Sequence, residues 1–175
     1  NTTKAQQKLE KSCKTAALPT PKGKSGFSVI DYVLPSGNKH GIRVISLGRA
    51  IDEIRTGIII QYTDGRTEKI ALDYGGKWAY SDLSGVPPYS IEAMGRFNGL
   101  KRNFQVACTC AWTGKEEFTV RLEYVNWISS TIFKFDIAAN EVTITDNWDQ
   151  KHPETYKITP VRLESLTTKS LIIIH

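Results

Sequence analysis

The dipeptide Asp64-Gly65, which lies between two β-rich stretches, is the feature that most constrains how this chain folds. Residues 58–63 before it contain three isoleucines, a tyrosine and a threonine, and residues 66–72 after it contain isoleucine, leucine and threonine. Asp-Gly between two such stretches signals a β-hairpin, because both central residues of a type I′ turn need positive φ. We therefore predict two antiparallel strands joined by a type I′ turn at Asp64-Gly65.

A period-two pattern of apolar residues extends the β prediction to most of the chain. In residues 117–127, large apolar side chains occupy every second position at Phe118, Val120, Leu122 and Tyr124. Such alternation is typical of a strand with one buried face and one wet face. Strands are expected at residues 29–34, 40–47, 57–63, 66–72, 77–80, 103–112, 117–127, 130–137 and 141–145, with weaker candidates at 156–163 and 170–174.

These segments number about eight to ten and recur at short, regular spacing, which is typical of all-β proteins. No helical period is found after residue 20. The sequence therefore predicts an all-β, antiparallel fold, either a sandwich or a closed up-and-down barrel. Closure would remove exposed strand edges, which suits a chain this rich in β-branched residues.

The first 26 residues differ in character from the rest. Residues 3–17 carry small or apolar side chains every four positions, which predicts a short helix with a thin apolar face. Pro19 disfavours helix in the residue before it, so the helix ends at Leu18. We therefore divide the chain into a helix with a Pro/Gly linker (1–26) and an antiparallel β domain (27–175).

The net charge of +5 is also confined to this leader. Residues 1–24 hold six lysines and one glutamate, so the β domain is neutral overall. Nucleic-acid binding needs a basic face on the folded domain, so we expect no nucleic-acid partner. No apolar run reaches the length of a membrane span. The chain begins at Asn1 without an initiating Met, which indicates a mature chain or a fragment.

The cysteines and histidines suggest no metal or cofactor site. Cys108 and Cys110 are two residues apart, so in a strand they share a face and are badly placed for a mutual disulfide. Cys13 lies far from both in the sequence, and we interpret all three cysteines as small buried or half-buried thiols. His40, His152 and His175 have no partner at metal-ligand spacing and are interpreted as plain surface or turn residues.

Three short patterns match the catalytic elements of penicillin-recognising hydrolases. Ser36 and Lys39 fit Ser-x-x-Lys, residues 124–126 fit Tyr-x-Asn, and residues 39–41 loosely fit the Lys-Thr-Gly element. A nucleophilic serine of this type must open a helix, whereas Ser36 lies in a predicted turn. We therefore expect no catalytic residue in this chain. An autonomous hydrolase acting through Ser36 is the least favoured hypothesis.

Aromatic side chains are the remaining candidates for a binding site. In a barrel, some of them would line a pocket mouth, although tryptophan and tyrosine are also ordinary core and rim residues of β proteins. The candidate ligand-binding residues are Trp78, Tyr80, Trp112, Tyr124 and Trp127.

The ordered set of segments resembles the C-terminal region of bacterial serine hydrolases of the β-lactamase and penicillin-binding protein superfamily. The resemblance is carried by the helix and Leu-Pro-x-Pro-x-Gly linker (8–23), the hairpin (60–72), a Gly-Trp segment (74–78) and three later strands (107–112, 117–125 and 131–135). It implies an eight-stranded, lipocalin-like antiparallel barrel attached to an enzyme outside the cytoplasm, either periplasmic or secreted. The catalytic residues of such an enzyme would lie upstream of Asn1.

Two functions follow from these observations. The resemblance implies a non-catalytic accessory domain that packs on or caps the upstream catalytic domain, or that mediates assembly with further copies of the chain. The alternative is a free-standing lipocalin-like protein that binds a small apolar ligand inside the barrel.

Overall fold

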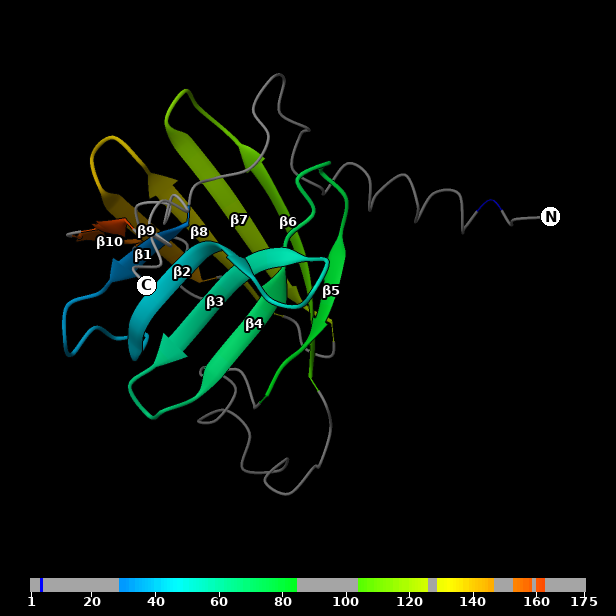
Figure 1. Cartoon of the computed structure of the whole chain (residues 1–175), viewed down its shortest axis with the longest axis horizontal. Helices are drawn as coiled ribbons and strands as arrows, with labels where there is room; N and C mark the ends of the chain where they lie inside the picture. The colour runs from blue at the N-terminus through cyan, green and yellow to red at the C-terminus, as the bar shows by residue number, and fades with distance from the viewer. Residues whose placement is uncertain are drawn as a thin grey trace, which may run out of the picture.

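The computed structural model describes residues 4, 29–84, 104–125, 129–146, 153–158 and 160–162. Apart from the helical Lys4, every regular element in this part of the chain is a β-strand, which confirms the all-β prediction (Figure 1). The strands are β1 (Ile30–Val33), β2 (Ile42–Ala50), β3 (Thr56–Tyr62), β4 (Thr67–Ala71), β5 (Ala79–Asp82), β6 (Gln105–Trp112), β7 (Glu117–Tyr124), β8 (Ser129–Asp136), β9 (Glu141–Asp146), β10 (Glu154–Lys157) and β11 (Pro160–Arg162).

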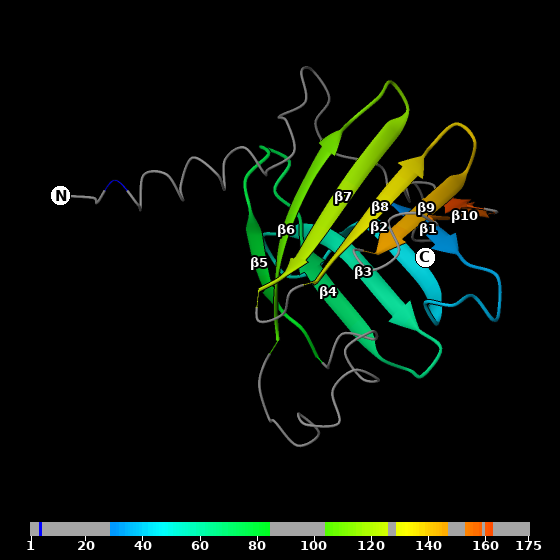
Figure 2. The same ribbon diagram turned by 180° about the vertical axis from the view of Figure 1, so that it is seen from behind.

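The strands form two antiparallel sheets. Sheet A has the order β11-β1-β2-β3-β4, and sheet B has the order β10-β9-β8-β7-β6-β5. Figure 1 shows β2 to β4 in front of β6 to β8, and the opposite view in Figure 2 reverses that order. The sheets therefore lie face to face, with the core between them.

The described residues form eleven strands in two antiparallel sheets, which is more than the eight to ten strands that the sequence predicts. The eight-stranded, lipocalin-like barrel implied by the resemblance stays a prediction. The predicted strand over 156–163 is divided between β10 and β11. Pro160 opens β11, as expected for a residue that has no N–H to donate to a ladder.

Several predictions fall outside the described residues. They are the linker, the strand over 170–174 and, except for the helical Lys4, the helix over 3–17. In the part of the chain that is described, no helix is long and apolar enough to cross a membrane.

The hairpin at Asp64-Gly65 is confirmed, but the predicted turn type is wrong. Strands β3 and β4 pair with Gln61 opposite Thr67. Gly65 has a φ of 89°, while Asp64 does not have a positive φ. The Gly65 N–H donates to the Tyr62 carbonyl oxygen at 3.2 Å, and the Tyr62 N–H donates to the Arg66 carbonyl oxygen at 2.9 Å. This geometry is a type I turn followed by a glycine bulge, which needs only one residue in the left-handed region.

The core is built from the alternating side chains of both sheets. Phe118, Val120 and Leu122 on β7 are fully buried, as the alternation predicts. Opposite them, the ring of Tyr32 from sheet A lies 5.1 Å from the ring of Phe135 in sheet B. A core of this kind holds the two sheets at a fixed separation, and that separation sets the dimensions of any space left at their ends.

Strand β6 departs from simple alternation because both of its faces are buried. Cys108 and Cys110 point into the core, and Thr109 and Ala111 on the other face are also inaccessible to solvent. Both cysteines are free thiols, which confirms their interpretation as buried residues. Burial raises the pKa of Cys110 to about 12, and burial also raises the pKa of Cys108 well above its ordinary value.

Candidate functional site

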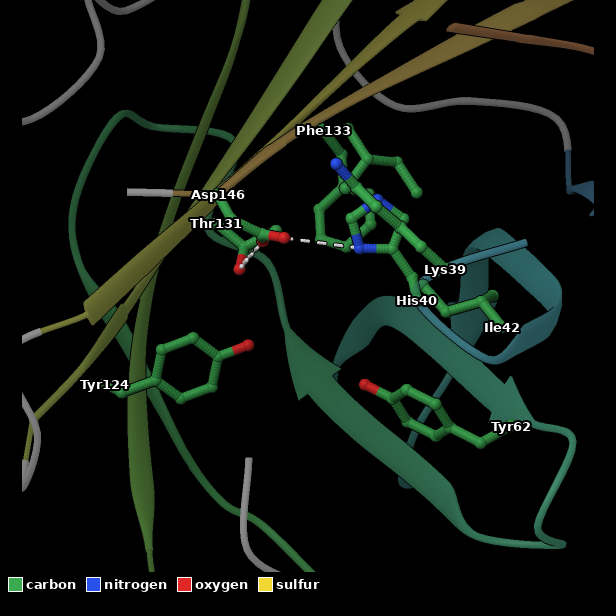
Figure 3. Close-up of a pocket in the computed structure, with 9 residues that line it drawn as sticks. Lys39, His40, Ile42, Tyr62, Tyr124, Thr131, Phe133 and Asp146 are labelled. Atoms are coloured by element: carbon green, nitrogen blue, oxygen red, sulfur yellow. Dashed lines mark hydrogen bonds and ion pairs between the residues drawn. The ribbon is translucent and has the colours of Figure 1, made fainter. Parts of the chain in front are cut away.

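A pocket of about 180 Å³ lies between the two sheets at one end of the core (Figure 3). Sheet A and the loop that enters it contribute Lys39, His40, Ile42 and Tyr62. Sheet B contributes Tyr124, Thr131, Phe133, Ile144 and Asp146. A cavity lined from both sheets by apolar walls and a few polar groups is the usual form of a small-molecule site.

The antiparallel order of the strands explains why these residues meet. In sheet A, Ile42 at the start of β2 is paired with Tyr62 at the end of β3. In sheet B, Thr131 near the start of β8 is paired with Asp146 at the end of β9, and β7 ends at Tyr124. Consecutive strands run in opposite directions, so the end of one strand and the start of the next lie at the same edge.

The loop between β1 and β2 is fixed by Asn38. Its side-chain amide donates to the carbonyl oxygens of Pro35 at 2.8 Å and Ile42 at 2.7 Å, and its Oδ1 accepts from the Ile42 N–H at 3.1 Å. Gly41 has a φ of 60°, a conformation that glycine adopts without strain. This framework holds the intervening His40 against sheet B, where only 10% of its side chain is exposed.

The imidazole of His40 is paired with Asp146. Its Nδ1 lies 3.3 Å from one carboxylate oxygen of Asp146, and the Thr131 hydroxyl donates to the other oxygen at 2.9 Å. Burial raises the pKa of Asp146, but the hydrogen bonds from His40 and Thr131 and the charges of His40 and Lys39 outweigh burial and leave the pKa below 3.8. Asp146 is therefore ionised at neutral pH, with a partner on each oxygen.

A second carboxylate lies on the other side of the imidazole. The Glu154 Oε2 is 3.9 Å from the Nε2 of His40, and its Oε1 is 3.0 Å from the Nζ of Lys39. Tyr156 donates a short hydrogen bond to Glu154, and this bond is the main reason that the pKa of Glu154 is lowered. Burial, together with Glu154, raises the pKa of Tyr156. His40 and Lys39 thus connect the β1–β2 loop to β9 and β10 at the rim of the pocket.

The Nε2 of His40 is buried and has no hydrogen-bond partner among the described residues. In an aspartate–histidine pair, this nitrogen would have to accept a proton from a nucleophile. None of the described hydroxyls or thiols is hydrogen-bonded to it, and the nearby Thr131 hydroxyl is committed to Asp146. The geometry therefore favours a structural role for His40, in which it holds the two sheets together at the pocket rim.

Two tyrosine hydroxyls point into the pocket from opposite sheets (Figure 3). Tyr62 and Tyr124 are 8% and 7% exposed, so their rings are largely removed from solvent. Burial, followed by the proximity of Tyr124, raises the pKa of Tyr62 far above its ordinary value. The guanidinium of Arg66 lies 4.4 Å from the Tyr62 ring centre and packs on the ring. Tyr62 therefore presents a neutral hydroxyl to the pocket throughout the physiological pH range.

Of the aromatic candidates named from the sequence, Tyr124 lines this pocket. Trp112 instead lies at the end of β6 with its ring 5.4 Å from Phe118, and Tyr80 is 58% exposed on β5. Trp78 is half-buried in the segment before β5, and Trp127 lies outside the described residues.

The short catalytic-like patterns are only partly brought together. Lys39, His40 and Tyr124 line the pocket, whereas Ser36 is exposed in the β1–β2 turn and Asn126 lies outside the described residues. The described residues contain no cluster of His, Cys, Asp and Glu that would hold a metal ion.

The sequence reasoning missed Tyr62, His40 and Asp146 as pocket residues. His40 was interpreted as a plain surface or turn residue, and it does lie in the turn, but its side chain is buried. One signal was available: Tyr62 is an aromatic residue at the end of the strand predicted before Asp64-Gly65, just as Tyr124 is the last residue of β7.

Comparisons with known proteins leave the family open. No protein-family model, no curated protein and no solved structure matches this chain. The relation to serine hydrolases of the β-lactamase and penicillin-binding protein superfamily therefore stays a prediction.

Proposed function

We propose that this domain is a lipocalin-like binding module that holds a small molecule in the pocket between sheets A and B. The observation that carries the proposal is the convergence of apolar walls and two inward-pointing hydroxyls, from both sheets, on one partly open cavity of about 180 Å³. Pockets of this make-up fix the orientation of a ligand with a few polar groups and take most of the binding energy from apolar contact.

The strand order supports a flattened, up-and-down barrel around this pocket. Within both sheets each strand neighbours the next in sequence, and β11 returns to pair with β1. Between the sheets, the Ala71 N–H on β4 donates to the Ser81 hydroxyl on β5 at 2.9 Å. On the other side, β10 and β11 follow each other closely in the chain. Barrels of this topology hold a ligand at one end.

The accessory-domain hypothesis remains a second proposal. It rests on the sequence resemblance and places the chain outside the cytoplasm, attached to a catalytic domain or assembled with further copies of itself. A binding module attached to a hydrolase would satisfy both proposals. The test for attachment is co-expression with the upstream region: hydrolysis unchanged by this domain, with no contact between the two pieces, would reject it.

Binding is tested by titrating the isotope-labelled chain with four single-ring compounds: ethylbenzene, acetophenone, benzoate and benzylamine. We expect at least one of them, at millimolar concentration, to shift the backbone amide resonances of Thr131, Phe133 and Ile144 in two-dimensional NMR. The four compounds share a ring and differ in charge and in hydrogen-bonding groups, so a response to any of them reports on the cavity itself.

A cavity-filling variant supplies the control. Ile144→Phe adds a ring at the pocket wall and is expected to abolish the shifts, with Ile42→Phe as a second filling variant if Ile144→Phe does not fold. Ile132→Phe makes the same change outside the pocket, on the other face of β8, and is expected to leave binding unchanged. The proposal is overturned if no compound shifts the pocket amides, or if filling the cavity leaves binding as it was.

A further inference from the structure

Asp146 places a negative charge in the wall of the pocket, and both of its oxygens already have a partner. The Nδ1 of His40 lies 3.3 Å from one oxygen, and the Thr131 hydroxyl donates to the other at 2.9 Å. The carboxylate is ionised at neutral pH. Because each oxygen is already engaged, this charge acts on a ligand mainly through space, which favours a cation that has no N–H groups to satisfy.

The rest of the rim does not reverse this sign. The Nζ of Lys39 lies 3.0 Å from Glu154, so the ammonium already has a counter-ion. His40 lies between Asp146 and Glu154 and adds a positive charge only when its imidazole is protonated. Its Nε2 is inaccessible to solvent, so a ligand in the pocket does not contact this nitrogen. The described part of the rim is therefore negative or balanced in either protonation state of His40.

The charged groups next to Tyr62 also leave a negative excess. Burial is the main reason that the pKa of Tyr62 is raised. Among the charged groups, Arg66 acts most strongly and lowers this pKa, while Glu68 and Asp64 raise it. The Nε of Arg66 is 2.7 Å from Asp64, so this cation too has a counter-ion. Glu68 is buried and accepts from the N–H and the hydroxyl of Ser84. Two carboxylates and one guanidinium make this side of the pocket more favourable for a cation than for an anion.

Aromatic rings form the wall beside Asp146. Thr131 is paired with Asp146, and Phe133 follows two residues later on the same face of β8. Tyr124, the last residue of β7, lines the same pocket (Figure 3). Phe133 and Tyr124 are 2% and 7% exposed, so water has little access to either ring. The face of an aromatic ring attracts a cation, and the attraction is stronger where water is excluded.

The hydration of the cation decides which kind suits this wall. A primary ammonium is strongly hydrated and brings three N–H donors, which need acceptors inside the pocket. A quaternary ammonium has no N–H donor, and aromatic-lined sites in other proteins recognise it. An engaged carboxylate beside two rings therefore favours a quaternary ammonium group.

The volume and the Tyr62 hydroxyl specify the rest of the ligand. A cavity of about 150 Å³ holds benzene in another protein, so 180 Å³ suits a compound with about one more non-hydrogen atom. Tyr62 is 8% exposed, and its hydroxyl points into the cavity without a hydrogen bond to any described residue (Figure 3). A buried phenol normally donates to an acceptor. A neutral acceptor fits here, because a carboxylate would add to the negative excess.

Taking the pocket to be a binding site, we propose that its ligand is a small quaternary ammonium alcohol. The ammonium group lies beside Asp146, against the rings of Phe133 and Tyr124, and the alcohol oxygen accepts from the Tyr62 hydroxyl. Ile42 and Ile144 contact the remaining methyl and methylene groups. Choline is the simplest compound of this class.

The test compares choline with its neutral analogue 3,3-dimethyl-1-butanol, in which a carbon atom replaces the nitrogen. Both carry the same hydroxyl and have nearly the same shape, so the ratio of their dissociation constants isolates the charge. Choline is expected to bind about ten-fold more tightly than the analogue. Ethanolamine, which carries a primary ammonium, is expected to bind at least about ten-fold more weakly than choline. Dissociation constants come from the amide shifts of Thr131 and Ile144.

Matched pairs of variants assign the preference to the ring and the carboxylate. Phe133→Leu keeps an apolar side chain and is expected to reduce the ten-fold ratio to about three-fold or less. Phe118→Leu makes the same change near the start of β7, outside the pocket, and is expected to leave the ratio unchanged. Asp146→Asn is the second pocket variant, with the same expected effect as Phe133→Leu. Its control is Asp136→Asn, which removes the same charge at the last residue of β8.

A separate variant tests the hydrogen bond from Tyr62. Tyr62→Phe is expected to weaken choline and its neutral analogue alike, by about five-fold, because both lose the same bond. Tyr80→Phe removes a hydroxyl from a side chain that is 58% exposed on β5 and is expected to change neither constant. If Tyr62→Phe leaves both constants unchanged, the position of the alcohol oxygen is wrong.

The outcomes separate this inference from the proposed function. If no compound binds in the pocket, choline included, the proposed function fails and the ligand class fails with it. If the pocket binds ring compounds but choline binds no more tightly than its neutral analogue, or more weakly than benzoate or ethanolamine, the ligand class is overturned while the binding module stands. A preference for choline that survives both Phe133→Leu and Asp146→Asn overturns the ligand class as well.

Discussion

The pair formed by His40 and Asp146 is expected to contribute measurably to the free energy of unfolding. His40→Ala removes the imidazole and leaves the carboxylate with Thr131 alone, and Asp146→Asn removes the negative charge but keeps an oxygen for Thr131. The double variant completes a cycle that isolates the interaction between the two side chains.

The size of the effect follows from burial and distance. The two side chains are 10% and 17% exposed, so solvent screens the interaction little. Hydrogen bonds to charged groups contribute about 1.5 to 3 kcal/mol. The 3.3 Å separation is longer than that of a strong charge-assisted bond, which places the pair at the lower end. We expect a coupling free energy of about 1.5 kcal/mol at neutral pH.

The interaction also predicts a pH dependence whose sign can be worked out. The pKa of Asp146 in the folded chain lies below 3.8, so its stabilising contribution is fully present above 3.8 and is lost as pH falls through the folded pKa. In His40→Ala, only the hydrogen bond from Thr131 and the charge of Lys39 remain to oppose the effect of burial on Asp146. The pKa of Asp146 is therefore lowered less than in the natural chain. The stability difference between the natural chain and His40→Ala is therefore largest at neutral pH and narrows below 3.8.

Urea unfolding of the four chains at neutral pH and at about pH 3 measures both quantities. Lys39→Ala is the control, because it removes the neighbouring ion pair with Glu154, in which both side chains are more than one-third exposed. We expect it to lower the free energy of unfolding by less than about 1 kcal/mol. A coupling free energy below about 0.5 kcal/mol at neutral pH, or one that is equally large in acid, would refute this account of the rim.

Three further substitutions or reactions test the core. Phe135→Ala empties a fully buried site and should cost about 3 to 5 kcal/mol in urea unfolding; a loss below about 1 kcal/mol would show that the sheets close over the space. Gly57→Ala places a methyl group 2.1 Å from the carbonyl oxygen of Ile70, so it should lower the thermal midpoint by several degrees, and an unchanged midpoint would argue against this pairing of β3 with β4. Cys108 and Cys110 should react with a thiol reagent at neutral pH only after unfolding, in a chain whose remaining cysteine is replaced by serine; rapid reaction in the folded state would contradict their burial.

Local sequence signals predicted much of the sheet structure. The alternation of residues 117–127 identified the buried face of β7, and the Asp64-Gly65 pair located a hairpin that the structure contains. Both signals act between residues that are close in the chain. The type of turn was not predicted, because Asp-Gly fits both the type I′ turn and the type I turn with a glycine bulge.

The candidate site depends on contacts between distant parts of the chain. His40 and Asp146 meet only because β2 begins and β9 ends at the same end of the two sheets, and nothing near either residue in the sequence indicates its partner. Local sequence patterns also do not indicate which side chains face the other sheet. In Ile58-Ile59-Ile60, for example, Ile59 is half-buried and its neighbours are fully buried, so hydrophobicity alone does not say which side chain faces the core.

The pairing of β1 with β11 has a consequence for how the chain reaches its final structure. Ile30 lies opposite Arg162, so the first strand that the ribosome releases from this region completes its ladder with the last. Until that late strand emerges, the free edge of β1 carries unpaired N–H and C=O groups that another nascent chain could bind. A truncation before Pro160 would make that exposure permanent, and such a chain should aggregate during synthesis even though the hairpin of β3 and β4 is intact.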